Sequence, residues 1–387
     1  RPSYVLGGRG METCFSEDQL LHYMRSAVDV SELADAPVLI DQFLAEAIEV
    51  DVDVVADYSE STDQPRALVC GVMEHIEEAG VHSGDSACAI PPYSLPQDVI
   101  ERLVSQSRRL AGALRVCGLM NVQYAITRPS ETQKDYEIYV LEVNPRASRT
   151  VPFVSKATGI SWARVAAKVM AGLPLDQIEV EENLQPPHTS VKESVFPFSK
   201  FPGVDIILGP EMRSTGEVMG IDTDFGIAFA KSQMAAGSSL PTEGDIFLSV
   251  RDSDKPQIVA VAKQLLELGF IIHSTGGTYT YLQERGVAVK PIAKISEGRP
   301  NAVDMIKNGE LQLIINTPTR KGMATDEGKL RAAAVRFNVP TITTPTGAAA
   351  AARAIAALRA GTWGVKAMQD YYPEYSTGNA VRLTTTT

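Results

Sequence analysis

The chain has 387 residues, of which 44% are hydrophobic and 21% charged, and its formal net charge is −11 at pH 7. This length suffices for two or more domains with a sizeable core, and the acidic balance without a basic stretch argues against nucleic acid as a partner. No apolar run approaches a membrane-spanning helix and the first residues are polar, so we expect neither a membrane protein nor a secretory signal.

Cysteine and histidine usage argues against a disulfide framework and against a transition-metal site. The four cysteines are far apart, and the five histidines are equally dispersed. Neither set has the spacing of a zinc site. A reducing, cytoplasmic compartment fits this pattern best. Because position 1 is an arginine rather than a methionine, we also expect the natural chain to begin upstream.

The first predicted segment, residues 1–56, begins with a short strand and a glycine-rich turn. Gly7-Gly8 would let backbone N–H groups approach a phosphate, although a plain hairpin turn explains the pair equally well. A helix is predicted over 16–26. From Ile48 to Val54 apolar and acidic residues alternate, which predicts a half-buried strand.

A strand is predicted over 67–73, and a polar loop over 74–86 follows it. The loop is punctuated by glycines and rich in titratable groups, and such loops hold substrates or ions when a rigid scaffold positions them. Two adjacent prolines then fix a rigid connection. From 97 to 116 apolar residues recur at helical spacing, which predicts an amphipathic helix packed on the core.

The most informative stretch is a predicted hairpin of two strands, 119–127 and 136–143. If its loop is centred midway between them, Gln123 lies close to Glu142, and the alternation of side chains puts Glu142 and Asn144 on one face. One carboxylate and two amides would then converge, and Mg²⁺ accepts such ligands while keeping waters and substrate phosphates. An amphipathic hairpin with a surface acid is the competing interpretation for Glu142 alone.

Two arginines, Arg146 and Arg149, follow the second strand of this hairpin directly. Guanidinium groups are well suited to hold phosphate oxygens. Because an acid, amides and arginines arrive together, the stretch predicts a magnesium–nucleotide site with anion clamps beside it.

Between the hairpin and residue 241 the pattern is less regular. A helical pattern runs from 152 to 172, a strand or extended arm from 191 to 198, and a turn-rich polar loop from 209 to 217. The stretch 235–241 is made of small residues and ends on proline, which predicts a linker between domains.

After this linker, strands and helices alternate five times. Five β–α units predict a small doubly wound parallel sheet, whose ligands bind at the carboxyl ends of the strands. The predicted strands are 246–250, 270–272, 287–289 continuing towards 292, 311–315 and 341–343, and the predicted helices are 255–268, 278–285, 302–308, 329–337 and 347–360.

Polar residues gather near those carboxyl ends. The Thr-Gly-Gly-Thr turn at 275–278 opens a helix and is a ready phosphate site, whereas a simple tight turn is the alternative. Two nearby lysines favour the phosphate site. The candidate residues are Lys255, Thr275, Thr278, Lys294, Asn316 and Thr317.

Four stretches carry a family resemblance. They are Arg1 to Arg9 (RPSYVLGGR), the loop from Glu74 to Ala87, Glu142 to Lys156 (EVNPRASRTVPFVSK) and Phe201 to Gly220. Together they closely resemble the large subunit of carbamoyl phosphate synthetase, and the match is specific and covers nearly all of the chain.

The resemblance implies an α/β and α+β multidomain fold: part of the second ATP-grasp half, then a regulatory domain of the methylglyoxal-synthase-like type. The implied domains are a remnant of the ATP-grasp lid subdomain at 1–56, the catalytic subdomain with its connector at 57–237, and a doubly wound, five-stranded allosteric domain at 238–387.

The activity that the resemblance implies is the second phosphorylation of the pathway, in which carbamate and MgATP give carbamoyl phosphate and ADP for pyrimidine and arginine biosynthesis. In the family, the first half of the large subunit makes carbamate from bicarbonate and ammonia, and a small glutaminase subunit supplies the ammonia. The implied partners are that small subunit, the remainder of the large subunit and further copies in an oligomer. The implied ions are Mg²⁺ or Mn²⁺, with K⁺ as a further candidate.

Site roles follow from the resemblance residue by residue. Gln123, Glu142 and Asn144 would hold the divalent metals. Asn144, Arg146 and Arg149 would serve catalysis, with the arginines steadying the transferring phosphoryl group and carbamate. Contacts with the nucleotide are implied for Arg1, Glu49, His82, Gln123 and Glu142.

Regulation is implied in the same way. The six candidates of the last domain match positions that bind a nucleotide effector such as UMP, although Pro318 stands where the family often has a threonine and removes a hydroxyl. Glu77, Asp85 and Glu193 match an acidic pocket for the ornithine amines, whereas an aspartate expected near Ile342 is absent. We therefore expect inhibition by UMP and a weak response to ornithine.

Other functions remain open at this point. The chain could be a nucleotide-binding or oligomerisation module, or another ATP-grasp carboxylate ligase such as a biotin carboxylase, since the Glu-Val-Asn-Pro-Arg ending is shared across that superfamily. The terminal five-strand domain favours the synthetase. That domain offers no carboxylate base in its phosphate-binding turns, so methylglyoxal synthase activity is not expected. Because the subdomain that completes the nucleotide cleft would lie upstream, we expect the isolated chain to make no carbamoyl phosphate from bicarbonate.

Overall fold

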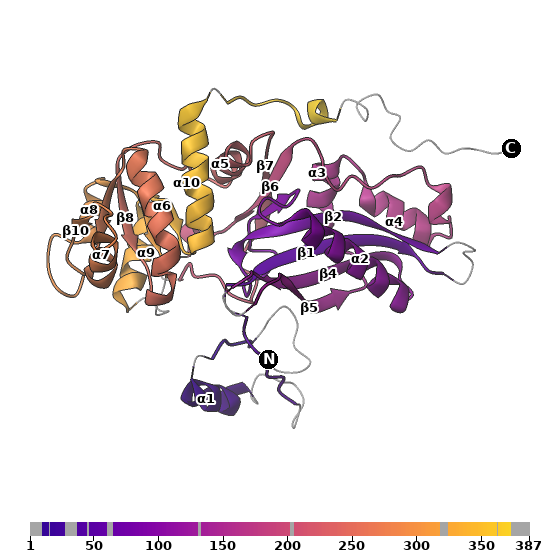
Figure 1. Ribbon diagram of the computed structural model, residues 1–387, viewed down its shortest axis with the longest axis horizontal. Helices are drawn as coiled ribbons and strands as arrows, with labels where there is room; N and C mark the ends of the chain where they lie inside the picture. Colours follow the sequence, from indigo (N-terminus) through magenta and orange to yellow (C-terminus); the bar gives the residue numbers. More distant parts are fainter. Residues whose placement is uncertain are drawn as a thin grey trace.

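The computed structural model describes residues 10–14, 16–27, 37–44, 46–59, 65–130, 133–201, 205–317, 324–361 and 363–372. Within these residues the chain forms a seven-stranded sheet of order β5-β4-β1-β2-β3-β6-β7 and a five-stranded sheet of order β10-β9-β8-β11-β12. The two sheets lie side by side with helices on their faces (Figure 1). The predictions for Arg1, the Gly7-Gly8 turn and Pro318 fall outside the described residues.

The seven-stranded sheet is antiparallel at every pairing. Its strands are β1 (Ile48–Asp57), β2 (Arg66–Glu78), β3 (Cys88–Ile90), β4 (Cys117–Thr127), β5 (Glu137–Asn144), β6 (Thr189–Val195) and β7 (Gly216–Asp222). Strand β1 pairs with β2 on one side and β4 on the other along its whole length. The predicted domain boundary at residue 56 therefore falls inside β1, an interior strand of this sheet.

Both faces of β1 are covered, and all ten of its residues are buried, so the prediction of a half-buried strand was wrong. Val50, Val52 and Val54 pack with helix α2 (Gln97–Ala113) in one hydrophobic cluster. On the other face Val55 packs with helices α3 (Val151–Thr158) and α4 (Trp162–Met170). The acidic residues of β1 share this second face, because alternate side chains point the same way.

Several elements differ from the predicted ones. Strand β2 runs on to Glu78, so Glu74 to Glu78 belong to the sheet rather than to a loop. Strand β3 and helix α5 (Phe225–Ala235) had no predicted counterpart. The single helical pattern at 152–172 is divided because Gly159 adopts φ 76°, a left-handed conformation that ends α3.

The five-stranded sheet is parallel throughout, so the predicted doubly wound sheet is confirmed. Its strands are β8 (Asp245–Ser249), β9 (Ile271–Ser274), β10 (Lys290–Pro291), β11 (Leu311–Asn316) and β12 (Thr341–Ile342). The helices between and after them are α6 (Lys255–Glu267), α7 (Gly276–Gln283), α8 (Ala302–Lys307), α9 (Asp326–Arg336) and α10 (Pro345–Ala360). The third strand was predicted from Val287 towards Ile292, and its paired residues, Lys290–Pro291, lie within that stretch.

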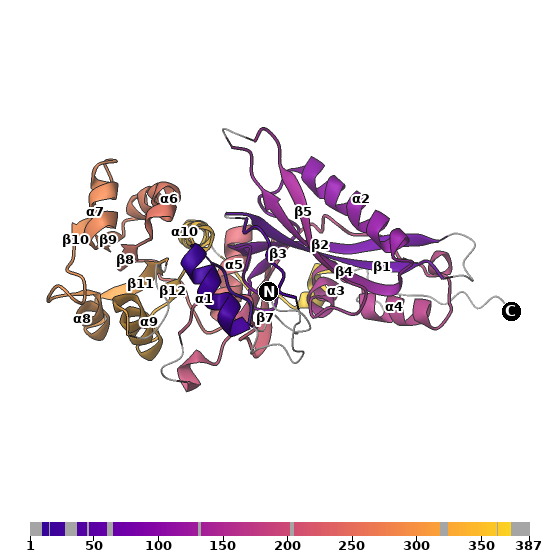
Figure 2. The same ribbon diagram turned by 90° about the horizontal axis from the view of Figure 1, so that it is seen from below.

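The two sheets share one hydrophobic core across the predicted linker. Phe225 and Ala228 of α5 belong to the same cluster as Ile355 of α10 and Ile246 of β8. Figure 2 shows α10 and α5 lying between the sheets. The stretch 235–241 is thus a short connection within a continuous core, with Ala236 capping α5.

The chain ends of the described part are tied differently. Helix α1 (Glu17–Ala27) stands off from both sheets (Figure 1), and Gly10 N donates to Glu211 Oε1 over 3.2 Å. After α10 the chain returns to the larger sheet, where the Tyr372 hydroxyl donates to Lys156 O over 2.8 Å. Short 3₁₀ helices occur at Leu175–Gln177, Phe198–Lys200, Asp252–Asp254 and Met368–Tyr371. Over the described ranges no helix combines the length and apolar character needed to cross a bilayer.

Candidate metal–nucleotide site

The predicted metal ligands lie together at one edge of the seven-stranded sheet. Gln123 of β4 pairs with Glu142 of β5, and Asn121 pairs with Asn144. Residues directly opposite each other in an antiparallel ladder project to the same face. Asn144 Nδ2 also donates to Glu142 Oε1 over 2.6 Å. The structure therefore brings one carboxylate and two amides onto a common surface.

A β-bulge creates this arrangement. Tyr124 pairs with Val140, whereas Gln123, the residue before Tyr124 in β4, pairs with Glu142. Leu141 therefore has no partner in the ladder. In a regular ladder Gln123 would face Leu141, and Glu142 would point to the opposite side of the sheet. The extra residue in β5 thus turns the acid onto the face of Gln123.

The loop over 82–86 packs against these ligands. Gln123 Nε2 donates to Ser83 Oγ over 3.1 Å, and buried Lys192 of β6 donates to Ser83 O over 2.9 Å. His82 Nδ1 accepts from Gly84 N over 2.9 Å. Burial lowers the pKa of His82, and the charge of Arg149 adds to that effect against the opposing charge of Asp85. His82 is therefore neutral at neutral pH and lies close to Arg149.

A row of acids on β1 forms the floor behind the ligands. Glu49 is only 4% exposed and accepts from Gly80 N, and burial raises its pKa to about 7. Next on the same face, Asp51 and His75 are buried and joined at 2.9 Å. Burial raises the pKa of Asp51, but hydrogen bonding and the charge of His75 outweigh it and hold the pKa below its usual value.

The two predicted anion clamps extend from the loop after β5. Arg146 Nη2 donates to Asn144 Oδ1 over 3.3 Å, and the Arg146 side chain is exposed. Arg149 is also exposed, and its guanidinium contacts the sulfur of Met212. Buried Asp53 accepts hydrogen bonds from Ser148 and Thr150, the neighbours of Arg149. The arginines thus stand at the rim of a surface whose base is fixed.

The donor set fits a hard divalent ion that carries phosphates. Among the residues that the structure describes, no group of three His, Cys, Asp or Glu side chains is arranged for a metal, so a site here depends on amide oxygens as well. Gln123 commits its amide nitrogen to Ser83, which leaves the oxygen end for an ion. With the Glu142 carboxylate and Asn144, this set leaves coordination positions for phosphate oxygens and water, as Mg²⁺ requires.

The second predicted cluster lies at the carboxyl ends of β8, β9 and β11. The strand order places β9 and β11 on either side of β8, which creates a switch point where ligands of such sheets bind. Thr278 Oγ1 accepts from Val250 N, and Thr317 Oγ1 accepts from Arg251 N. Thr275 Oγ1 lies 2.9 Å from Ser249 Oγ. Four hydroxyl groups, three of them on predicted residues and one on Ser249, are therefore held within one site.

Two lysines converge on the turn that opens α7. A Cβ on Gly277 would lie 2.9 Å from Lys255 Nζ, and a Cβ on Gly276 would lie 3.3 Å from Lys294 Cε. Asn316 donates to Ser249 O, while its buried Oδ1 has no partner among the residues described. A helix start, two cations and an unpaired polar atom in one place favour an anionic ligand with hydrogen-bonding groups.

The three acids matched to an amine pocket divide into two kinds. Both oxygens of Asp85 accept backbone N–H groups, from Arg213 and Ser214 at 2.8 and 2.9 Å, so this carboxylate fastens the loop over 205–215. Glu77 accepts from Ala87 N over 2.7 Å. Glu193 is 8% exposed, and burial followed by the charge of Glu77 raises its pKa to about 8. The pair of Glu77 and Glu193 is the part suited to a cation.

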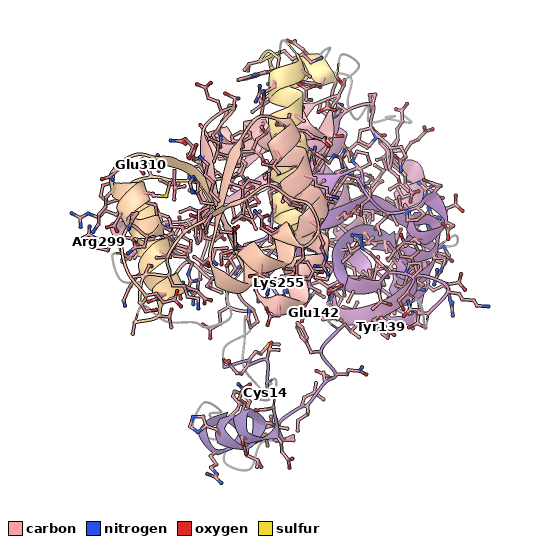
Figure 3. All side chains as sticks on the ribbon, turned by 60° about the vertical axis from the view of Figure 1, so that its left-hand side comes forward. Cys14, Tyr139, Glu142, Lys255, Arg299 and Glu310 are labelled. Atoms are coloured by element: carbon pink, nitrogen blue, oxygen red, sulfur yellow. The ribbon has the colours of Figure 1, made fainter. Side chains whose placement is uncertain are left out.

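Sequence reasoning missed four residues that shape these sites. Ser83, Ser249 and Met212 each touch a predicted site residue. Asp53 instead accepts hydrogen bonds from Ser148 and Thr150, the chain neighbours of predicted Arg149. The acid alternation on β1 was visible in the sequence and could have singled out Asp53. For the other three, no local pattern separates them from ordinary loop residues. Figure 3 labels Glu142 on β5 and Lys255 at the start of α6, which mark the two sites on their separate sheets.

Comparisons with known proteins agree with two units in the chain. The family model described as carbamoyl-phosphate synthase L chain, ATP binding domain, matches residues 1–178, and the one described as MGS-like domain matches residues 257–343. The biotin carboxylase domain of Hydrogenobacter thermophilus 2-oxoglutarate carboxylase, solved with MgADP, ADP and bicarbonate, is 14% identical with a TM-score of 0.46, covering 61% of this chain and 55% of that one.

Among curated relatives, the carbamoyl phosphate synthase large chain of Rhodopirellula baltica is 52% identical, with 97% of this chain and 34% of that protein covered. The large chain of Archaeoglobus fulgidus gives the same three values. The chain therefore spans about a third of the length of these two relatives. A shorter Aquifex aeolicus protein, named as the C-terminal section of the large chain, is 51% identical, with 93% of this chain and 67% of that protein covered.

Proposed function

We propose that this chain, which belongs to the carbamoyl phosphate synthase large-chain family, provides the site at which MgATP phosphorylates carbamate to carbamoyl phosphate. It combines part of an ATP-grasp fold with an MGS-like domain. The observation that carries the proposal is the pairing of Gln123 with Glu142, beside Asn144, on one face of the sheet.

Each residue has a defined part in the proposed transfer. Gln123, Glu142 and Asn144 would hold the divalent ion, which would supply charge neutralisation for the nucleotide phosphates. Arg146 and Arg149 hold the oxygens of the transferring group and of carbamate. Buried Glu49 accepts a hydrogen bond from the nucleotide, and the neutral imidazole of His82 lies beside the nucleotide. No covalent nucleophile is needed, because alignment and charge neutralisation lower the barrier.

The proposal is tested with a full-length large chain that contains these 387 residues. Carbamoyl phosphate and MgADP are supplied, and formation of ATP is followed, since this is the reverse of the proposed step and needs neither bicarbonate nor ammonia. We expect ATP to form with both substrates and a divalent metal present. A large chain that folds, binds MgADP and forms no ATP would contradict the assignment.

The remaining properties of the proposal follow from the family. We propose that ammonia comes from glutamine through a small subunit, that the rest of the large chain supplies carbamate, and that the product feeds pyrimidine and arginine synthesis in the cytoplasm. Mg²⁺ or Mn²⁺ serves the nucleotide, K⁺ is a further candidate ion, and the assembly is an oligomer. The isolated chain, at about a third of the length of the two full large chains above, is proposed to be inactive with bicarbonate.

For the MGS-like domain we propose binding of a UMP-type nucleotide at the carboxyl ends of β8, β9 and β11. The convergence of Lys255 and Lys294 on Gly276 and Gly277 supports a phosphate at the start of α7. The unpartnered oxygen of Asn316, within the described part of the chain, suits a donor such as the base N–H.

Replacing Lys255 and Lys294 together with methionine should lower UMP affinity about 10–100-fold, because two contacts to phosphate are lost at about 0.7–1.4 kcal/mol each. Calorimetric titration of the chain with UMP measures the effect. Lys263→Met on the exposed side of α6 is the matched control and should leave the affinity unchanged. Equal affinity of the double variant and this control would reject the proposed phosphate position.

For the acidic pair Glu77 and Glu193 we propose weak binding of a diamine such as ornithine. The pKa of Glu193 is raised from 4.5 to about 8, so the folded state binds more protons than the unfolded state between these values. The stability contributed by its protonated form is complete below pH 4.5 and is lost as pH rises through about 8. A bound amine would reduce this loss of stability, because its positive charge neutralises the pair Glu77 and Glu193.

Glu193→Gln should therefore remove part of the decline in stability between pH 5 and 8. Thermal unfolding midpoints of the chain and the variant, measured across this range, check the sign. We expect the unfolding midpoint of the variant to rise relative to that of the unaltered chain as pH increases. Ornithine should raise the midpoint of the unaltered chain only. A constant difference between the two proteins at every pH would contradict the assignment to Glu193.

A further inference from the structure

We propose that Asp53 is a positioning residue for phosphoryl transfer, because it holds the loop that carries Arg146 and Arg149 without itself touching substrate. This inference rests on the proposed function, since it assigns a purpose to the arginines. It concerns a carboxylate in the centre of β1, two strands away from the metal ligands on β5.

The hydrogen bonds of Asp53 bracket Arg149. Asp53 Oδ1 accepts from Ser148 Oγ over 2.8 Å, and Oδ2 accepts from Thr150 Oγ1 over 2.7 Å. The two hydroxyls also lie 2.7 Å from each other. Arg149 therefore projects from a backbone segment that is fastened immediately before and immediately after it to a single side chain.

The same carboxylate is tied to the strand that carries a metal ligand. Asn121 Nδ2 donates to Asp53 Oδ1 over 2.9 Å and to Asp51 Oδ1 over 3.2 Å. Asn121 is the ladder partner of Asp53 on one side and of Asn144 on the other. Asp53, Asn121 and Asn144 thus form one row across three strands. Asp53 therefore fixes the position of the arginine loop relative to a row that contains a proposed metal ligand.

Burial makes Asp53 a firm anchor. It is 0% exposed, and it accepts all three bonds away from bulk water, where bonds to a carboxylate are strong and unscreened. Three donors hold its carboxylate, so it transmits the geometry of the sheet to the loop. Helix α3 begins at Val151, directly after Thr150, so the loop is also fixed at its far end. An error of about 1 Å in such a clamp costs roughly 10²-fold in rate.

A merely structural carboxylate would act differently, and the chain contains one for comparison. Asp57, on the same strand and face, is 2% exposed and accepts from Leu175 N over 3.1 Å. It is buried like Asp53, but the side-chain bonds described for it go to Leu175 N and Ser59 Oγ rather than to the arginine loop. Asp57→Asn should lower stability and leave the kinetics of transfer unchanged.

The test uses the full-length large chain and the formation of ATP from carbamoyl phosphate and MgADP. Asp53→Asn should lower kcat about 10–100-fold with the KM for MgADP unchanged, as expected for loss of an outer hydrogen-bond partner. Ser148→Ala combined with Thr150→Ala, which keeps the carboxylate, should give a similar loss. In an Arg149→Met background, Asp53→Asn should lower kcat by a smaller factor than it does alone, because the arginine to be positioned is gone.

Three outcomes would overturn the inference. They are an Asp53→Asn chain with unchanged kcat, like Asp57→Asn; a full additional loss in the Arg149→Met background; and a Ser148→Ala, Thr150→Ala chain with normal kcat. The last of these decides the matter if Asp53→Asn does not fold. Failure of the proposed function looks different, because the unaltered large chain would then form no ATP from carbamoyl phosphate and MgADP.

Discussion

Arg149→Met in a full-length large chain is expected to lower phosphoryl transfer by about 10²–10³-fold, the usual loss for one preorganised charge donor. Arg149 is exposed at the rim of the site. Burial lowers the pKa of His82, and the nearby charge of Arg149 adds to that effect. Methionine keeps much of the length of the side chain and removes the charge. The loss should therefore appear in kcat, with MgADP binding retained through Gln123 and Glu142.

The measurement is again the formation of ATP from carbamoyl phosphate and MgADP. Arg164→Met, on the exposed side of α4, is the control for removing one surface arginine and should behave like the unaltered protein. If Arg149→Met retained full activity, the proposed clamp would be refuted. If it lost MgADP binding instead of turnover, Arg149 would belong to the nucleotide rather than to the transferring group.

Asp205→Ala should destabilise the fold by about 3–5 kcal/mol, because it leaves a buried guanidinium without its partner. Arg331 of α9 is 1% exposed, and it holds Asp205 through two parallel bonds, Nε to Oδ1 and Nη2 to Oδ2, both 2.8 Å long. Its third nitrogen, Nη1, finds no other acceptor in the described ranges. The pair joins the MGS-like domain to the loop over 205–215.

Urea denaturation of the chain measures this change in the free energy of unfolding. Glu284→Gln is a suitable control, since Glu284 is 65% exposed and 3.7 Å from Arg285, and exposed pairs contribute about 0–1 kcal/mol. Arg331→Met should cost less than Asp205→Ala, because it removes the buried charge instead of isolating it. A loss below about 1 kcal/mol for Asp205→Ala would show that water reaches Arg331 and that the pair is not a fixed joint.

The hairpin illustrates how far sequence reasoning reaches and where it stops. Strand propensity and a loop centred midway predicted that Gln123 lies near Glu142, and the ladder has this pairing. The pairing depends on a bulge at Leu141, which no local signal announces, because a bulge is set by the packing of both faces of the strand. A regular ladder with the same loop would have turned Glu142 away from Gln123.

Burial was harder to predict than periodicity. The alternation from Ile48 to Val54 indicated one solvent-exposed face. That face is covered by α3, α4 and the site loops, and its acids are held by hydrogen bonds. The five β–α units were predictable because each repeats the same local pattern. The role of Asp85 was not, since its two acceptor bonds come from residues more than a hundred positions away.

The central claim is that Gln123, Glu142 and Asn144 together hold a metal–nucleotide. The most direct measurement is the binding of Mn²⁺–ATP to the 387-residue chain, followed by the electron paramagnetic resonance of free Mn²⁺, for the chain, Glu142→Gln and Glu137→Gln. Glu137 is an exposed acid on the same strand and serves as the control. We expect nucleotide-dependent binding of Mn²⁺ that Glu142→Gln abolishes and Glu137→Gln leaves intact. Binding that persists unchanged in Glu142→Gln would contradict the claim.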